Sequence, residues 1–588
     1  MSPARGLLFA LVFPALPAVA QHTMFPPVLG TREMVGAANN LEVEAGFRIL
    51  EQGGNAVDAG VAATLAAAVT EQSRFGLGGE MPLLVKMAGK PVVAVSGIGV
   101  APAKATVDFY SHRSAEPWEL PGRLPPIPAQ GIRSAITPGV LDGLLLALEK
   151  YGTISFAQVV QPAIECADGF PIEDEFAELL GTFVSTIRDW PDAYRFFYPT
   201  GKPPRRHELV RMPELARTLR ELAGAEGKAR GDRAAKIQAV RDLFYRGSIA
   251  KRIAAFSDAN GGLIAYEDLA RFSADVNEPK SATYRGYTVY KPGFWTQGPV
   301  MLETLNLLEG FDLKKMGHNS PEYLHTLVEA VKLSFADRDR FYGDPKFSAI
   351  PEEVLLSKSY AAERRKLIDP AHASMQSRPG DLNASAPMAG GNGKSSDHDT
   401  TCVNVIDRSG NAFSATPSGA WLPSVIAGDT GIPLSTRLQS FVVTPGHANQ
   451  LAPGKRPRVT LSPTVVSKDG QLDFIMSTPG GDNQDQALLQ VFLNMVEFGM
   501  NPQEAVESPR FQSEHFYNSF AYHEFTPGVL SLEARMPRSV GEKLGALGHR
   551  VQIAGDWSNG SAPTVIQVRD KVLEGGADPR RARFIFGK

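Results

Sequence analysis

The order of apolar and polar residues predicts two helices near the start of the chain. The segment after Asn40 repeats apolar residues at helical spacing, so Asn40 is the expected N-cap of the first helix. Residues 56–70 are apolar on nearly every side of a helix, and Asn55 and Asp58 have the spacing of a capping box. This second helix must therefore be buried.

Strands follow these helices, and the rest of the chain mixes both kinds of element. The stretch FGLGGEMPLLVKMAGKPVVAV contains a glycine-rich bend and two strand patterns around a turn at Ala88-Gly89-Lys90. The bend does not fit G-x-G-x-x-G and precedes a strand, which excludes a dinucleotide-binding loop. Residues 110–390 are mostly helical, and the residues after 400 are mostly strands and glycine turns. The fold class is therefore α/β (α+β), with a sheet-rich C-terminal third.

A β-hairpin is predicted where a flexible segment ends. The sequence SSDHDTTCVNVIDRSGNAFSAT (395–416) starts with small polar residues and continues as a strand, a turn at 408–411 and a returning strand. Thr400 and Thr401 stand at the junction. A threonine pair is ordinary at the start of a strand. A cut before Thr400 would instead place a free α-amine, which is a general base, beside a hydroxyl nucleophile.

Composition makes a small molecule the expected partner. The 588 residues are 43% hydrophobic and 21% charged, which is a globular composition, and the formal net charge is −3. This charge balance does not indicate binding to nucleic acid. No stretch after the N-terminus is long and apolar enough to span a membrane.

The N-terminus and the two cysteines bear on the compartment. Residues 1–20 combine a basic residue, an apolar run and an A-x-A cleavage pattern, which predicts a signal peptide and a periplasmic or secreted protein. In such a compartment Cys166 and Cys402 could pair, although their positions in the sequence do not bring them together.

A second candidate for chemistry is the stretch IMSTPGGDNQDQALLQ. It predicts a strand ending at Ser477-Thr478, a bend at Pro479-Gly480-Gly481 and a helix starting near Asp482 or Asn483. Two glycine amides in such a bend can hold an oxyanion, although an ordinary Pro-Gly turn gives the same pattern. The sequence contains neither H-E-x-x-H nor G-x-S-x-G, so we expect no metal site, no cofactor and no nucleophile elbow.

Eight stretches, in order, resemble the γ-glutamyltranspeptidase family. They run from about residue 30 to about residue 570 and are NNLEVEAGFRILEQGGNAVDAGVAATLAAAVTE, GLGG, RGYTVYKP, FADRDRFYGDP, DTTCVNVIDRSGNAFSAT, PGKRPRVTLSPT, STPGGDNQ and GMNPQEAVESPRF. The resemblance implies a four-layer αββα sandwich of the N-terminal-nucleophile hydrolases. It also implies a chain that cuts itself into a large subunit, 21–399, which carries most of the helices, and a small subunit, 400–588.

The same resemblance implies roles for individual residues. Thr400 is the nucleophile, Ser418 is a second hydroxyl that supports it, and the Gly480 and Gly481 amides form the oxyanion hole. Thr401 adjoins the nucleophile and could support it, and a purely structural role for Thr401 fits the sequence equally well.

The chain departs from the family where typical members grip a glutamyl group. Ile98 stands in place of an arginine, and Val459 and Thr460 stand in place of two serines, all of which hold the α-carboxylate in typical members. Ser440 replaces the aspartate that pairs with the α-amine in typical members. Arg437 replaces a glutamine, and Ala420 replaces an asparagine. The predicted substrate-binding residues are therefore Ile98, Ala420, Arg437, Ser440, Val459 and Thr460, in a pocket that has lost its zwitterion clamp.

Several functions remain open at this point. The leading hypothesis is a periplasmic or secreted amidohydrolase that acts on a small-molecule amide through Thr400, as a heterodimer of its own two subunits. Arg437 could hold an acid on the substrate, or Phe294 and Trp295 could make an apolar pocket unless they only pack against the sheet. The alternatives are a true γ-glutamyltransferase or glutathione hydrolase, and a non-catalytic binding protein on the same fold. The retained Thr400 and Ser418 argue against the last of these.

Overall fold

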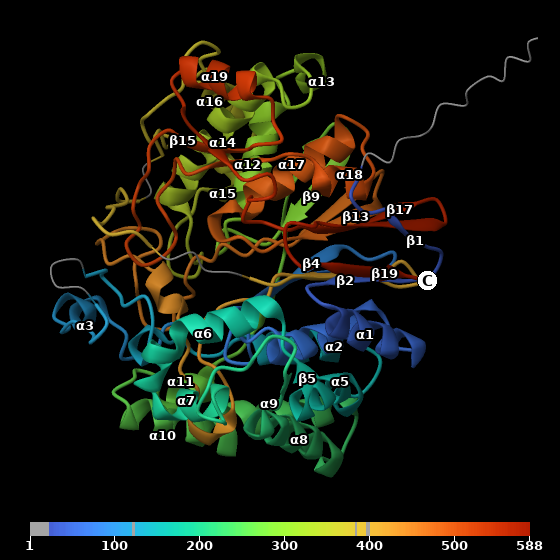
Figure 1. Ribbon diagram of the computed structural model, residues 1–588, viewed down its shortest axis with the longest axis vertical. Coiled ribbons are helices and arrows are strands. Elements are labelled where there is room, and N and C mark those ends of the chain that lie inside the picture. Colours follow the sequence, from blue (N-terminus) through green and yellow to red (C-terminus); the bar gives the residue numbers. More distant parts are fainter. Residues whose placement is uncertain (1–22, 120–123, 383–384, 396–399) are drawn as a thin grey trace, which may run out of the picture.

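Two antiparallel sheets lie face to face between two helical layers (Figure 1). This computed structural model describes residues 23–119, 124–382, 385–395 and 400–588. The predicted signal peptide, residues 1–20, and Asp399 at the predicted cut lie outside the described residues. The α/β class predicted from the sequence is confirmed.

The first sheet has seven strands, all in antiparallel pairs. Their order is β1 (Val28–Gly30), β18 (Val572–Ala577), β17 (Thr564–Arg569), β13 (Gln471–Ser477), β12 (Thr464–Lys468), β9 (Tyr287–Lys291) and β8 (Lys280–Tyr284).

The second sheet also has seven antiparallel strands. Their order is β19 (Phe584–Gly587), β2 (Met34–Ala37), β10 (Val403–Ile406), β11 (Ala412–Ala415), β3 (Met81–Lys86), β4 (Val92–Gly97) and β7 (Asp275–Asn277). Apolar side chains from both inner faces meet between the sheets, among them Met34, Ile406, Ile475 and Ile566.

Smaller sheets lie outside the sandwich. One has three strands, β14 (Phe511–Ser513), β15 (Val529–Glu533) and β16 (Arg550–Ala554), and the other has two, β5 (Phe170–Pro171) and β6 (Leu209–Val210).

Helices from before Thr400 cover the outer face of the second sheet (Figure 1). This part of the chain contains α1 (Asn40–Glu51), α2 (Ala56–Thr70), α4 (Val140–Tyr151), α5 (Phe156–Asp168), α6 (Asp174–Arg188), α7 (Pro191–Phe197), α8 (Pro213–Lys228), α9 (Arg233–Tyr245), α10 (Ser248–Ala259) and α11 (Tyr266–Arg271), with α3 (Val107–Ser111) at one side.

Helices from both parts of the chain cover the outer face of the first sheet. They are α12 (Pro299–Leu308), α13 (Leu313–Met316), α14 (Pro321–Phe341), α15 (Glu352–Leu355), α16 (Lys358–Arg365), α17 (Gln484–Val496), α18 (Pro502–Glu507) and α19 (Arg538–Ala546). Among the described residues, α1 to α16 therefore precede Thr400 and α17 to α19 follow it, as expected from the sequence.

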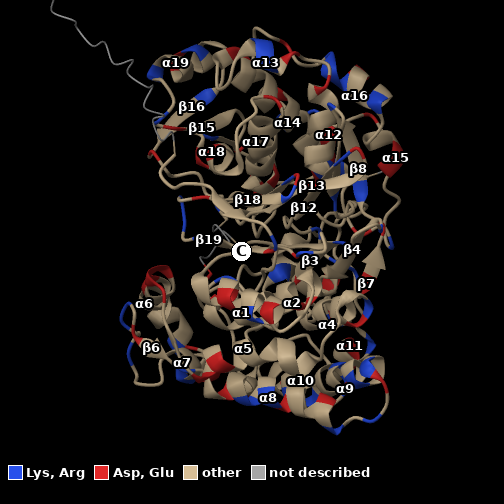
Figure 2. Cartoon of the chain, turned by 90° about the vertical axis from the view of Figure 1, so that its right-hand side faces the viewer, with Lys and Arg blue, Asp and Glu red and all other residues tan. Residues whose placement is uncertain are grey.

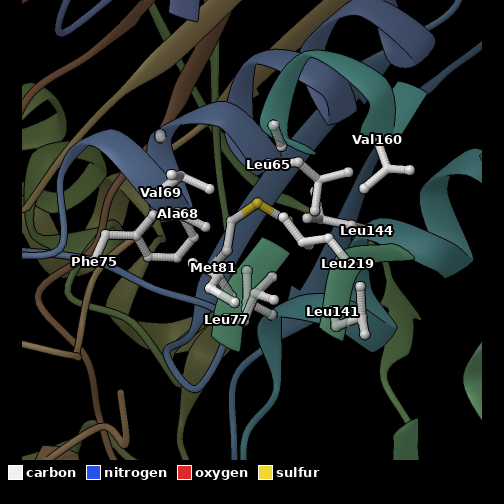
Figure 3. Close-up of a cluster of buried hydrophobic side chains, with 14 of the residues drawn as sticks. Leu65, Ala68, Val69, Phe75, Leu77, Met81, Leu141, Leu144, Val160 and Leu219 are labelled. Atoms are coloured by element: carbon white, nitrogen blue, oxygen red, sulfur yellow. The ribbon is translucent and has the colours of Figure 1, made fainter. Parts of the chain in front are cut away.

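Helix α2 is the centre of the larger hydrophobic core. Every residue from Ala56 to Thr70 is buried, as its apolar sequence predicts. Leu65, Ala68 and Val69 of this helix pack with side chains from neighbouring helices and from β3, including Met81 (Figure 3). Close packing on all sides leaves no solvent-facing stripe, which accounts for the lack of amphipathic pattern.

The predicted helix caps are confirmed in one case and corrected in the other. Asn55 caps α2, and Asp58 completes the capping box. The N-cap of α1 is Asn39, not Asn40, because the Asn39 side chain accepts hydrogen bonds from the Leu41 and Glu42 amides. Two adjacent asparagines made the position ambiguous by one residue.

Charged residues of both signs lie along the outer helices (Figure 2). No helix in the described part of the chain has the length and apolar character needed to cross a membrane. Cys166 and Cys402 are both free thiols, so the pairing considered from the sequence does not occur here.

The contact between α2 and β11 gives a first prediction. A Cβ atom on Gly60 would lie 2.3 Å from the Phe413 ring, so Gly60→Ala should destabilise the fold by about 1–3 kcal/mol through overpacking. The matched control is Gly181→Ala in α6, where a Cβ meets nothing within 4 Å, and this change should stabilise by about 0.4–1 kcal/mol. Urea unfolding curves compare the two variants, and equal effects of one sign would refute this packing argument.

Candidate functional site

The register of one hairpin brings two hydroxyl residues together. Strands β10 and β11 pair with Val403 opposite Ala415, and the same alignment continues outward to an isolated bridge between Thr400 and Ser418. The turn that sets this register is held by Asp407, whose Oδ1 accepts from the Ser409 and Asn411 amides. The hairpin predicted from the sequence is confirmed.

The side-chain oxygens of this pair are in contact. Thr400 Oγ1 lies 3.1 Å from Ser418 Oγ, and both residues are buried. The indole Nε1 of Trp421 donates to Ser418 Oγ at 3.2 Å. An indole N–H only donates, so it occupies a lone pair of Ser418 and leaves the serine hydroxyl able to donate to Thr400. A donor at Thr400 Oγ1 stabilises the negative charge that develops there as its proton leaves.

Gln484, the first residue of α17, approaches the same oxygen. Its Nε2 lies 3.5 Å from Thr400 Oγ1, while its Oε1 accepts from the Ser462 amide. The second contact fixes the orientation of the Gln484 amide, so that its donor side faces the threonine.

Gly480 and Gly481 form the bend predicted between β13 and the next helix. A 3₁₀ turn spans Gly481–Asn483, and α17 begins at Gln484. The φ angles of the two glycines are 120° and 52°, in the region that favours glycine. Within the described part of the chain, neither glycine amide is donated to another residue. Two such amides are suited to hold an oxyanion.

A cavity of about 910 Å³ opens beside these amides. Gly480, Gly481, Trp421 and Phe520 line it, and it extends to the polar face of the three-stranded sheet, where Gln512, Ser531 and Gln552 lie in register across β14, β15 and β16. The cavity is large enough for a small organic substrate.

The sequence-predicted pocket residues separate into an apolar group and a polar group. Ile98 and Val459 form a buried cluster with Trp295 and Leu461, and these four side chains carry no charge themselves. Phe294 is not part of this cluster, because it packs edge-on against Tyr342 in the helical core.

Arg437 and Ser440 mark the polar group. They stand at the two ends of the 3₁₀ turn Arg437–Ser440, and both are fully buried. Arg437 Nε donates to Glu80 Oε1 at 2.5 Å, and its Cζ lies 4.3 Å from the Trp421 ring centroid. Burial raises the pKa of Glu80, and the Arg437 charge offsets part of that rise.

The remaining predicted residues, Ala420, Thr460 and Thr401, are also buried. Ala420 adjoins Trp421 and brings no polar atom to the site. Thr460 follows Val459, and its hydroxyl has no partner among the described residues. The Thr401 hydroxyl is also buried without a partner there.

Sequence reasoning missed three residues that the structure brings to the site. They are Glu80, Trp421 and Gln484. The motif STPGGDNQ contains Gln484, so its position was available, but its contact with Thr400 was not. Glu80 is separated by more than 350 positions from Arg437, and no local pattern signals that contact.

A hydroxyl nucleophile needs a neighbouring group that orients or accepts its proton. It also needs hydrogen-bond donors for the oxyanion that its attack creates. A buried hydroxyl pair close to two glycine amides that have no acceptor among the described residues is typical of the amide hydrolases and acyltransferases.

Comparisons with known proteins agree with this class and narrow it. The chain matches the family Gamma-glutamyltranspeptidase over residues 43–587. It is 33% identical over 577 residues to the glutathione hydrolase proenzyme of Escherichia coli (strain K12), covering 95% of this chain and 92% of that protein. It is 32% identical over 541 residues to the Acylase ACY 1 proenzyme of Pseudomonas sp. (strain SE83), covering 91% of this chain and 90% of that protein.

A solved structure supports the same assignment. The crystal structure of a cephalosporin acylase from Bacillus halodurans has a TM-score of 0.83 and 28% identity, covering 99% of each chain. The protein belongs to the γ-glutamyltranspeptidase family, as its sequence motifs predicted.

The hydroxyl pair gives a second prediction. Ser418→Ala removes the donor to Thr400, so kcat for a chromogenic acyl anilide should fall about tenfold, the effect of a net hydrogen bond of about 1–1.5 kcal/mol. Ser418→Thr keeps the hydroxyl and should restore most of the rate. Trp421→Phe keeps the ring but loses the N–H, and it should fall between the two. Wild-type kcat in Ser418→Ala would show that the contact plays no part in turnover.

Proposed function

We propose that the protein is a self-processing amidohydrolase whose nucleophile is Thr400. It would be cut between Asp399 and Thr400 into a large subunit, 21–399, and a small subunit, 400–588, which stay together as a heterodimer. The observation that carries this proposal is the contact of 3.1 Å between Thr400 Oγ1 and Ser418 Oγ. The relatives named above are proenzymes, which supports the same proposal.

Processing needs no group other than Thr400 and water. The Thr400 oxygen attacks the carbonyl carbon of Asp399, and the peptide nitrogen leaves with a proton. The result is an ester between Asp399 and Thr400 Oγ1. The departing nitrogen is now the free α-amine of Thr400, and water hydrolyses the ester to the Asp399 carboxylate and the threonine hydroxyl.

The free amine then serves in turnover. It takes the proton of the Thr400 hydroxyl as the oxygen attacks a substrate amide, and the Gly480 and Gly481 amides hold the oxyanion. The amine returns the proton to the leaving nitrogen, which leaves an acyl ester on Thr400. Water, activated by the same amine, hydrolyses this ester and releases the acid. The fold would then be an N-terminal-nucleophile hydrolase sandwich.

The acyl group is proposed to differ from γ-glutamyl. Ile98 and Val459, which by the sequence resemblance stand in place of residues that hold an α-carboxylate in typical family members, pack with Trp295. A charged group placed against this cluster would lose its hydration without a partner. True γ-glutamyl transfer or glutathione hydrolysis remains the second candidate, because one relative is named a glutathione hydrolase. Membership in a family of enzymes disfavours a non-catalytic binding protein.

The compartment is also a proposal. The pattern of residues 1–20 favours export to the periplasm or the medium, and its removal would leave Gln21 as the first residue. Partners other than the substrate amide and the protein's own second subunit are not expected.

Processing gives the third prediction. The purified protein should run as two bands on a denaturing gel, and the sequence of the smaller should begin Thr-Thr-Cys-Val. Thr400→Ala removes the attacking oxygen and should leave one band. The matched control is Thr401→Val, which keeps the shape of a buried side chain whose hydroxyl has no partner among the described residues. It should be processed as the wild type is.

Two outcomes count against the proposal. A fully active single chain would exclude Thr400 as an N-terminal nucleophile. Processing that is lost in Thr401→Val and retained in Thr400→Ala would assign the cut to the other threonine.

A further inference from the structure

One buried side chain next to the two glycine amides has an acceptor oxygen without a partner. Asn483 ends the 3₁₀ turn Gly481–Asn483 and is only 3% exposed. Its Nδ2 donates to Asn559 Oδ1 at 2.8 Å and to Ser561 Oγ at 3.0 Å. Within the described part of the chain, Asn483 Oδ1 accepts no hydrogen bond. Buried polar groups are almost always paired, so this oxygen is available to a bound molecule.

Neighbouring backbone groups fix which atom of the amide is left over. The Ser561 amide donates to Asn559 Oδ1 at 3.2 Å, and Asn559 Nδ2 donates to the Phe511 carbonyl at 3.3 Å. A backbone amide only donates and a carbonyl only accepts, so the two ends of the Asn559 side chain cannot be exchanged. Because Asn559 presents its oxygen to Asn483, the nitrogen of Asn483 must face it, and the unpaired end of Asn483 is the oxygen.

The ordinary role of an asparagine at this position does not account for the oxygen. Asn483 directly precedes α17 and makes no side-chain hydrogen bond to that helix. The asparagines that precede α1, α2 and α18 each accept hydrogen bonds from helix amides through Oδ1; they are Asn39, Asn55 and Asn501. Asn483 instead continues the turn, and its backbone amide donates to the Gly480 carbonyl at 2.9 Å. Its side chain is therefore not a helix cap.

The cavity places Asn483 on the nitrogen side of a bound amide. Gly480, Gly481 and Asn483 all line it, and it continues past Asn559 to the polar face of the three-stranded sheet. Among the described residues that line the cavity, none belongs to the predicted acyl-binding set. An amide whose oxygen lies at the glycine amides has its acyl chain on one side of the carbonyl and its nitrogen on the other. The cavity therefore suits the nitrogen and the leaving group.

From these observations we infer that Asn483 Oδ1 accepts a hydrogen bond from the N–H of the amide that is cleaved. The protein then selects amides that carry an N–H over esters and over tertiary amides, because only the N–H satisfies this buried oxygen. Holding the N–H on the Asn483 side leaves the lone pair that forms on the nitrogen during attack free to take the proton from the Thr400 α-amine. The inference rests on the proposed function, because it concerns the leaving group of the same reaction.

The fourth prediction compares a p-nitroanilide, which has the N–H, with the p-nitrophenyl ester of the same acid, which lacks it. The acyl group is whichever of γ-glutamyl, glutaryl and butyryl the wild type releases fastest from its anilide. Asn483→Leu keeps the size of the side chain and removes the acceptor. For the anilide kcat/KM should fall about tenfold, the effect of losing one hydrogen bond, and for the ester it should stay within about twofold.

Two further variants separate this role from a structural one. Asn483→Ala removes the same acceptor with a smaller side chain and should also lower the ratio of anilide to ester kcat/KM. Asn501→Ala is the matched control, because Asn501 Oδ1 accepts from the Glu504 amide. It should lower the midpoint of urea unfolding and leave the ratio unchanged. An unchanged ratio in both Asn483 variants would exclude a contact between Asn483 and the substrate N–H.

The outcomes distinguish this inference from the proposed function. An equal loss on the anilide and the ester in Asn483→Leu would assign Asn483 to the shape of the turn, which would overturn the inference and keep the amidohydrolase. No hydrolysis by the wild type of any of the three anilides or their esters would refute the amidohydrolase, and the inference with it. A loss confined to the anilide supports both.

Discussion

The contact between the two buried hydroxyls depends on the register of one β-hairpin. The pairing that aligns Val403 with Ala415 is the same one that aligns Thr400 with Ser418 beyond the strand ends. Side chains alternate along a strand, so a slip by one residue would turn Thr400 to the opposite face. The tight turn held by Asp407 is therefore as important to the hydroxyl contact as either hydroxyl residue, although it lies at the far end of the hairpin.

Glu80 connects the two halves of the site. Its backbone exchanges hydrogen bonds with Ser418, at 2.9 and 3.0 Å, and its side chain binds Arg437. Removing one partner of a buried ion pair typically costs about 3–5 kcal/mol, because the other charge is left without compensation. The geometry of the hydroxyl pair and that of the Arg437 side chain are thus tied through Glu80, and changes at Arg437 or Glu80 are expected to be tolerated best in combination.

Local patterns predicted most of the frame, and long-range contacts explain what they missed. The hairpin, the buried helix α2 and the end of β13 at Ser477 each follow from spacing that the sequence displays directly. Family motifs then pointed to Thr400, Ser418 and the two glycines. The orientation of Arg437 could not be read in this way, because it depends on Glu80 and on the Trp421 ring, which tertiary packing alone brings to it.

The order of strands has a consequence for the life of the protein after the proposed cut. In the second sheet β2 lies between β19 and β10, and in the first sheet β12 pairs with β9, so strands from before Thr400 are hydrogen-bonded to strands from after it in both sheets. Separating the two fragments would mean breaking backbone hydrogen bonds in both sheets at once. Folding of the intact precursor is a first-order process, whereas recovery of the cut protein from denaturant would require two chains to meet. Recovery would therefore depend on protein concentration, and the cell would in effect have one opportunity to fold each molecule.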